Sequence, residues 1–173
     1  MPSQSHLQDR KWLENDCLPK LRGSVLFVGV RKYNRGYQNL VPCPLLFETV
    51  DPDPKQAKYG SRTHHCKTAE SLLSGGGYCY DHVVAYGLIG MRDSLRSGKE
   101  EIVTMLKTLI AVATRSFVFG GSTDTVSMQD LNLLLELAGL ARWHTHRNFV
   151  VSPSPQHSDI LIRWSVRQGA HIA

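Results

Sequence analysis

The 173-residue chain has no long apolar run, and no stretch of it approaches the roughly 18 residues that a membrane-spanning helix needs. Its first 21 residues carry charges of both signs and lack the apolar core of a signal peptide. We therefore expect a cytoplasmic protein that does not span a membrane.

The chain also lacks the residue spacing of a zinc site. It has no CxxC pair, and its four cysteines are widely separated at Cys17, Cys43, Cys66 and Cys79. His64 and His65 would point to opposite faces of a strand, whereas His144 and His146 share a face but have no evident third ligand. We predict reduced, partly buried thiols and no bound metal.

Common catalytic motifs are missing too. The absence of GxGxxG, a P-loop, GxSxG and HExxH argues against the usual dinucleotide, phosphotransferase, hydrolase and zinc-protease sites. The formal net charge is +5, but lysine and arginine are scattered, so charge alone predicts no nucleic-acid partner. With 42% hydrophobic and 20% charged residues, the chain has the composition of one globular domain.

Short apolar runs rich in β-branched and aromatic residues recur along the chain. They predict strands over residues 24–30, 45–50, 63–69, 80–90 and 115–121. Helical patterns fall before and between them, over residues 5–18, 54–60, 69–75, 94–113 and 127–140. The longest has an apolar stripe of Ile102, Met105, Leu106, Leu109 and Ile110. Such alternation indicates an α/β fold.

Two further strand-like runs, residues 143–152 and 159–167, end the chain. Their linker is too short for a crossover helix, so they should form an antiparallel hairpin. The predicted fold is a doubly wound, mostly parallel seven-stranded sheet with this C-terminal hairpin and helices on both faces. We expect residues 1–22 to form a helical segment outside the core and residues 23–173 to form a single domain.

The exit of the first strand is the first candidate site, because ligands of such sheets lie beyond the carboxyl ends of the strands. Gly29 would let a ligand approach the backbone, and Arg31 and Lys32 could meet a carboxylate or phosphate. The alternative is a simple tight turn with solvated cations.

Asp51 ends the second strand, 22 positions after Gly29. An acid there can accept hydrogen bonds from both hydroxyls of a ribose. It could instead cap the helix that follows, although Asp53 suits the cap better.

The next two strand exits give weaker signals. Thr68 and Ala69 could lie beside an adenine ring, and Tyr86 could present its ring to a cofactor, with Gly87 opening the loop. Ordinary packing of Tyr86 explains its presence about as well.

The order of these segments resembles a class I S-adenosylmethionine-dependent methyltransferase from about Gly23 to Arg167. "VLFVGV" resembles the family's first motif, "ETVDPDP" its acidic second-strand end, "HHCKTAESLL" its adenine-side segment, "YDHVVAYGLIG" its fourth strand and "RSFVFGGSTDT" its fifth. "LLLELAGLARW" and the two runs after it resemble the last helix and antiparallel hairpin.

The resemblance implies S-adenosylmethionine as the cofactor and methyl transfer as the reaction. It implies ribose binding at Asp51, adenine at Thr68 and Ala69, Tyr86 and Gly87 beneath the bound molecule, and the methionine part along Gly29, Val30 and Arg31. Three positions depart from the family pattern. Phe27 replaces the usual acid, and Arg31 and Lys32 stand where further glycine is common, so that a cation could pair with the cofactor carboxylate.

We expect an enzyme that methylates an oxygen, nitrogen or carbon atom of a small molecule. The fourth strand lacks the Asn/Asp-Pro-Pro-Tyr/Phe sequence of many base-directed enzymes, which disfavours nucleic acid as a partner without excluding it. The alternatives are a catalytically silent member of this fold with a binding or regulatory role, and another nucleotide-binding α/β protein such as a minimal dehydrogenase. Neither the catalytic base nor the oligomeric state follows from the sequence.

Overall fold

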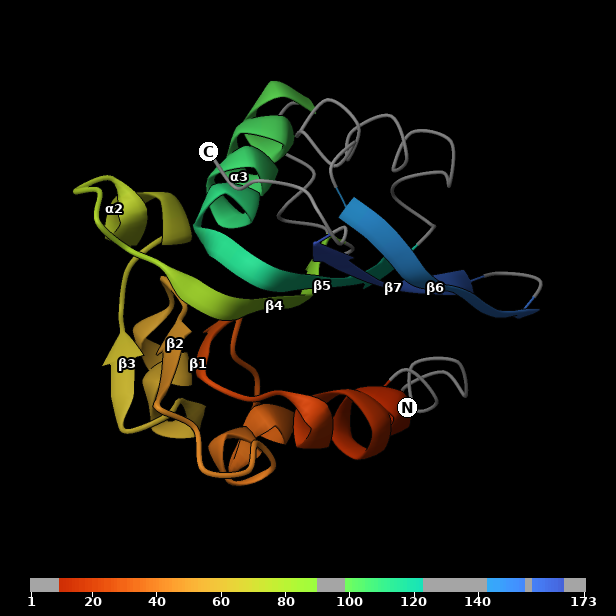
Figure 1. Ribbon diagram of the computed structural model, residues 1–173, viewed down its shortest axis with the longest axis horizontal. Coiled ribbons are helices and arrows are strands. Elements are labelled where there is room, and N and C mark those ends of the chain that lie inside the picture. The colour runs from red at the N-terminus through yellow and green to blue at the C-terminus, as the bar shows by residue number, and fades with distance from the viewer. Residues whose placement is uncertain (1–9, 90–98, 123–142, 155–156, 167–173) are drawn as a thin grey trace.

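The computed structural model describes residues 10–89, 99–122, 143–154 and 157–166, with side chains for residues 10–85 and 104–118. The described strands form one seven-stranded sheet in the order β3-β2-β1-β4-β5-β7-β6 (Figure 1). Their bounds are β1 (Ser24–Val28), β2 (Leu46–Val50), β3 (Thr63–His65), β4 (Tyr80–Ile89), β5 (Ala113–Ser122), β6 (Trp143–Ser154) and β7 (His157–Val166).

The central strand β1 pairs in parallel with β2 and β4, and parallel pairing continues to β3 on one side and β5 on the other. Strand β7 runs antiparallel to β5, and β6 runs antiparallel to β7. The apolar runs of β1 and β4 suit strands buried on both faces of a sheet. The prediction of an α/β sheet built on parallel strands with helices packed on it is confirmed.

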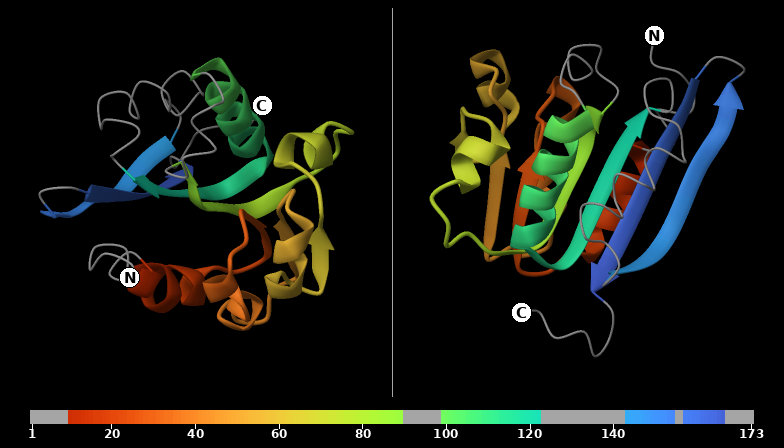
Figure 2. Two further views of the ribbon diagram at one scale, coloured as in Figure 1. Left: turned by 180° about the vertical axis from the view of Figure 1, so that it is seen from behind. Right: turned by 90° about the horizontal axis from the view of Figure 1, so that it is seen from above.

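Helices lie on both faces of this sheet (Figure 2). On one face are α2 (Ala69–Leu73) and α3 (Lys99–Val112), and α3 buries Leu106, Leu109 and Ile110 of the predicted stripe. The other helical turns are η1 (Leu13–Cys17), η2 (Leu18–Lys20), η3 (Lys32–Asn34), η4 (Tyr37–Asn39) and η5 (Pro54–Tyr59). The helix predicted over residues 127–140 lies outside the described residues. Within the described ranges, no helix has the length and apolar character needed to cross a membrane.

The N-terminal helical turns belong to the core, which corrects the prediction that they pack outside it. Leu13, Cys17, Leu18 and Leu21 are fully buried and form a cluster with the β1 side chain of Phe27. The turn η2 contains Pro19 and carries the helical path to Lys20 instead of ending it. The N-terminal helical turns lie beneath β1 (Figure 1), and their buried side chains cover this face of the sheet.

The prediction of partly buried thiols is wrong for three of the four cysteines. Cys17 is buried, whereas Cys43, Cys66 and Cys79 are exposed, and none of the four forms a disulfide. The three exposed cysteines lie in connections between strands, where the backbone runs over the surface.

Phe27 occupies the centre of the core beneath the first strand exit. Its ring meets that of Tyr37 edge-on, with centroids 5.6 Å apart, and stacks on that of Phe47 at 6.4 Å. Tyr37 is held in turn by its hydroxyl, which donates a 2.7 Å hydrogen bond to Glu14 Oε1. The position that carries an acid in the resembled family is therefore a packing position in this chain.

Phe27→Ala should lower the free energy of unfolding by about 3–5 kcal/mol, the usual cost of emptying a buried phenylalanine site. Urea denaturation measures the change. The matched control is Leu45→Ala, because Leu45 is 85% exposed and its truncation should cost about 0.5 kcal/mol at most. Equal effects of the two changes would contradict the packing role of Phe27.

Candidate functional site

The register of the parallel strands aligns the ends of β1, β2 and β3 with the middle of β4. Val28 is aligned with Val50 and with Ala85, and Val50 is aligned with His65. Gly29, Asp51 and Cys66 follow the ends of the first three strands, and Tyr86 follows Ala85 within β4, which continues to Ile89. The candidate residues predicted from β1, β2 and β4 therefore begin at neighbouring positions along this strand-end edge of the sheet.

Gly29 makes the turn that leaves β1. Its φ of 82° lies in the left-handed region, which glycine adopts without steric cost. Its amide donates to Val50 O at 3.0 Å, and the next amide, of Val30, donates to Asp51 Oδ2 at 2.9 Å. Two successive amides of the turn are thus bound to the end of β2.

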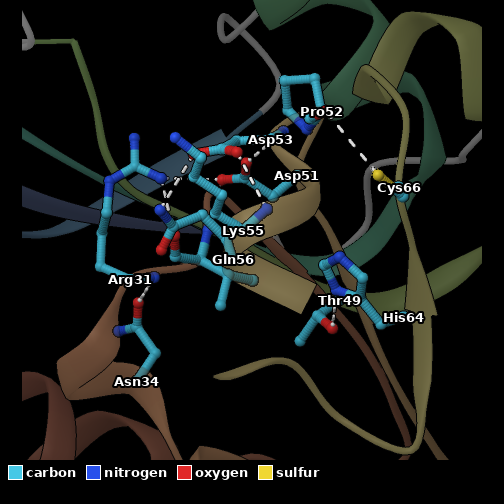
Figure 3. A network of polar contacts seen from close by, with 11 residues as sticks. Arg31, Asn34, Thr49, Asp51, Pro52, Asp53, Lys55, Gln56, His64 and Cys66 are labelled. Carbon is cyan, nitrogen blue, oxygen red and sulfur yellow. Dashed lines mark hydrogen bonds and ion pairs between the residues drawn. The ribbon is translucent and has the colours of Figure 1, made fainter. Parts of the chain in front are cut away.

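Asp51 is the most enclosed charged group of the edge, with a side chain only 4% exposed. Its Oδ2 accepts from Val30 N and from Arg31 Nη1, each at 2.9 Å, and its Oδ1 accepts from Asp53 N at 2.9 Å (Figure 3). Of the two roles left open for Asp51, the helix cap belongs to Asp53, whose Oδ1 accepts from Lys55 N.

Arg31 lies over Asp51 in the structure, while Lys32 is exposed. The Arg31 side chain is 32% exposed, and its Nη1 also donates to Val30 O at 2.6 Å. Asn34 fixes the Arg31 backbone on both sides, because Asn34 Oδ1 accepts from Arg31 N at 2.7 Å and Asn34 N donates to Arg31 O at 2.9 Å. Asn34 was not among the predicted site residues, although its place three positions after Arg31 is typical of such a turn.

Asp53 adds a second negative charge at the edge. A hydrogen bond from the Gln56 side chain, followed by that from the Lys55 amide, lowers the pKa of the Asp53 carboxyl. This carboxylate is exposed to solvent, unlike that of Asp51. The edge thus combines two carboxylates with the guanidinium of Arg31.

The other predicted residues lie after β3 and within β4. Thr68 caps α2 by accepting from Ser71 N at 3.1 Å, and Ala69 is buried. Tyr86 and Gly87 lie within the backbone of β4, where Tyr86 is aligned with Gly120 of β5. The side chain of Tyr86 lies outside the described part of the structure.

His64 and His65 contact different residues of β2, in agreement with their predicted opposite orientations. His64 Nδ1 lies 2.8 Å from Thr49 Oγ1, and His65 Nε2 lies 3.3 Å from Glu48 Oε1. Burial lowers the pKa of His64. In the described residues, no group of three potential ligands could hold a metal ion.

A small cavity of about 10 Å³ lies under this edge and is lined by Phe27, Asn34, Thr49 and Ser61 among others. The Asn34 Nδ2 atom is buried and has no hydrogen-bond partner among the described residues. About 10–15 Å³ suffices for one water molecule. A nucleoside does not fit there, so the candidate site is the strand-end edge above it.

The fold is that of known methyltransferases. The magnesium protoporphyrin IX methyltransferase of Synechocystis PCC 6803, solved with bound SAM, matches 94% of this chain and 78% of its own, with a TM-score of 0.61 and 16% identity. The N-methyltransferase NodS of Bradyrhizobium japonicum WM9 matches 93% of both chains, with a TM-score of 0.62 and 13% identity. This chain has a class I methyltransferase fold.

A putative SAM-dependent methyltransferase from Streptococcus mutans matches 95% of this chain and 50% of its own, with a TM-score of 0.67 and 8% identity. No protein-family model matches the sequence, and no curated protein sequence matches it. At these identities the methyltransferase likeness is one of fold, and the chemistry has to be argued from the site.

Gly60→Ala should destabilise the polar contacts beneath the site. A Cβ atom at Gly60 would lie 2.5 Å from His64 Nδ1 and 2.7 Å from Thr49 Oγ1, so their hydrogen bond must shift. We expect a loss of about 1–3 kcal/mol in the free energy of unfolding, measured with urea. Gly75→Ala is the control, since nothing lies within 4 Å of its added Cβ. Equal free energies of unfolding for the two variants would show that the His64 and Thr49 side chains move aside without loss of stability.

Proposed function

We propose that the protein is an S-adenosylmethionine-dependent methyltransferase acting on an oxygen, nitrogen or carbon atom of a small molecule. The observation that carries this proposal is the Gly29 turn joined to the buried Asp51 at the strand-end edge of a methyltransferase fold. In a doubly wound sheet this edge is where ligands lie.

The donors and acceptors at the edge fit such a cofactor. Asp51 offers a carboxylate for ribose hydroxyls, and Gly29 and Val30 offer close backbone approach to the methionine part. Arg31 and Lys32 supply positive charge for its carboxylate, Thr68 and Ala69 are the adenine side, and Tyr86 and Gly87 lie beneath. SAM-bound and SAH-bound structures of this fold support the choice of cofactor.

Methyl transfer from this cofactor requires few catalytic side chains from the protein. When bound, the cofactor supplies a methyl group already activated for in-line displacement. The chain has to align the acceptor atom with it, and a base is needed only when that atom must lose a proton. A protein that mainly aligns the acceptor with an activated methyl group does not need a conventional catalytic motif, and this chain has none of those sought in its sequence.

A small-molecule acceptor is supported by the sequence of β4, which lacks the base-directed motif. It is also supported by the fold neighbour whose name gives magnesium protoporphyrin IX as its substrate. We keep the cytoplasmic location as a prediction.

A catalytically silent member of the fold is the second candidate. The observation that favours it is the ion pair between Arg31 and Asp51, because Arg31 then covers the carboxylate that would bind the ribose. Calorimetry with S-adenosylhomocysteine, followed by transfer from methyl-labelled S-adenosylmethionine to a panel of metabolites, separates the two. Binding with transfer supports the enzyme, binding without transfer favours the silent protein, and no binding at millimolar ligand refutes the enzyme.

Asp51→Asn should weaken S-adenosylhomocysteine binding by about 1–3 kcal/mol, or roughly 5- to 150-fold, because one acceptor oxygen and the negative charge are lost. Calorimetry measures the affinity, and circular dichroism checks the fold. Asp53→Asn makes the same change in charge and should weaken binding less than Asp51→Asn, since the Asp53 side chain is occupied with capping η5. Unchanged affinity in a folded Asp51→Asn variant would assign Asp51 to the turn alone.

A further inference from the structure

The turns that follow β1 and β2 carry an excess of positive charge. Residues 31–38, which include η3, contain three cations and no acid, and residues 54–62, which include η5, also contain three cations and no acid. Arg31 is paired with Asp51. The exposed cations of these two segments, apart from Lys32 beside the candidate cofactor site, form what we call the basic surface: Arg35, Lys55, Lys58 and Arg62.

The fold brings these two segments together although β2 separates them in the sequence. The turns η3 and η5 are in contact, and the Arg62 amide donates to Gln38 Oε1 at 3.2 Å. The residues on both sides of Arg35 line the small cavity together with Tyr59 and Ser61. Figure 1 shows these turns in orange and gold, on the face of the sheet opposite to α2 and α3. Cations that are scattered along the sequence therefore lie on neighbouring turns.

The acids near the basic surface leave most of its charge unbalanced. Within residues 10–85 and 104–118, none of its four side chains forms a salt bridge. Asp53 precedes η5, and its two carboxylate oxygens accept from Lys55 N and Gln56 Nε2, so it offsets one of the four charges at most. The Lys58 ammonium lies 5.0 Å from the centre of the Tyr59 ring, an interaction that keeps the charge. The basic surface therefore presents net positive charge to solvent.

The surroundings of the basic surface favour phosphate groups as its ligands. Protein interfaces and membrane anchors use exposed apolar side chains. Among the described side chains, the large exposed apolar ones are Leu45, Leu46 and Tyr78, which lie at or before the starts of β2 and β4. They are thus at the opposite end of the strands from η3 and η5. Cations without apolar neighbours suit contacts to phosphates, which carry no information on base sequence.

We propose that the basic surface binds the phosphate backbone of a nucleic acid without regard to its sequence. Binding of this kind has dissociation constants of about 1–100 μM at physiological salt. The nucleic acid is a binding partner here and not the methyl acceptor of the proposed reaction. The inference is independent of the proposed function, because no cofactor takes part in it.

Fluorescence anisotropy of a labelled RNA of about 20 nucleotides measures this binding for the full chain between about 50 and 200 mM salt. A second RNA of unrelated sequence tests sequence independence. The double variant Arg35→Gln with Lys58→Gln removes one cation from each segment. The matched control is Lys20→Gln with Lys107→Gln, because both lysines are exposed and lie away from the basic surface, on η2 and α3. Circular dichroism checks the fold of both variants.

The salt dependence reports the number of phosphate contacts. Each contact on a single strand contributes about 0.7 to the fall of log K with log salt concentration. Four contacts predict a slope of about −3 for the wild type, and two predict about −1.4 for the basic-surface variant. Its affinity at low salt should fall by about tenfold or more. The control should keep the wild-type slope and nearly all of the affinity, since charges farther away than about 10 Å are largely screened.

Four results would overturn the inference. Equal losses in the variant and its control would show that net charge governs binding, and no RNA binding by about 0.1 mM folded wild type at low salt would refute the site. Binding to polyglutamate or to phosphatidylserine vesicles as tight as to RNA would assign the surface to an acidic protein or a membrane. A strong preference for one of the two RNAs would refute sequence independence. S-adenosylhomocysteine binding, measured separately, tests the proposed function.

Discussion

The carboxylate of Asp51 is the interaction on which the candidate site depends. It is nearly inaccessible to solvent, and a buried charge without partners costs several kcal/mol. The Val30 amide and the Arg31 guanidinium, which follow β1, are two of its partners. The third is the Asp53 amide, which follows β2. The positive φ of Gly29 is the backbone condition under which the Val30 amide reaches it.

Phe27 shows why the turn keeps its shape without an acid inside β1. The residue is buried against Tyr37 and Phe47, so the inner face of the turn is held by apolar packing. The chain from Arg31 to Asn39 then folds into η3 and η4 and returns Tyr37 to the core. Hydrophobic contact below and the Asp51 carboxylate above thus fix the same segment from two sides.

The sequence was sufficient to predict the strands, because apolar runs are a local signal. It also predicted that Gly29 and Asp51 lie at neighbouring strand ends, because strand-end topology follows a general rule of such sheets. It did not predict the partner of Arg31, since that depends on the rotamer of a long side chain and on the Asn34 turn. The burial of Leu13 and Leu18 was missed for a related reason. An amphipathic pattern indicates a buried face but not how much of the core that face closes.

Asp51 binds two backbone amides and one cation, so the backbone geometry and the charge balance of the candidate site depend on the same carboxylate. Its two backbone partners, the Val30 and Asp53 amides, hold the two strand ends together. The remaining partner among the described residues is the Arg31 guanidinium, whose Nη1 also donates to Val30 O, so the buried charge of Asp51 is matched within the same turn. The turn after β1 is therefore held to the end of β2 by backbone hydrogen bonds and by one ion pair that meet at the same carboxylate.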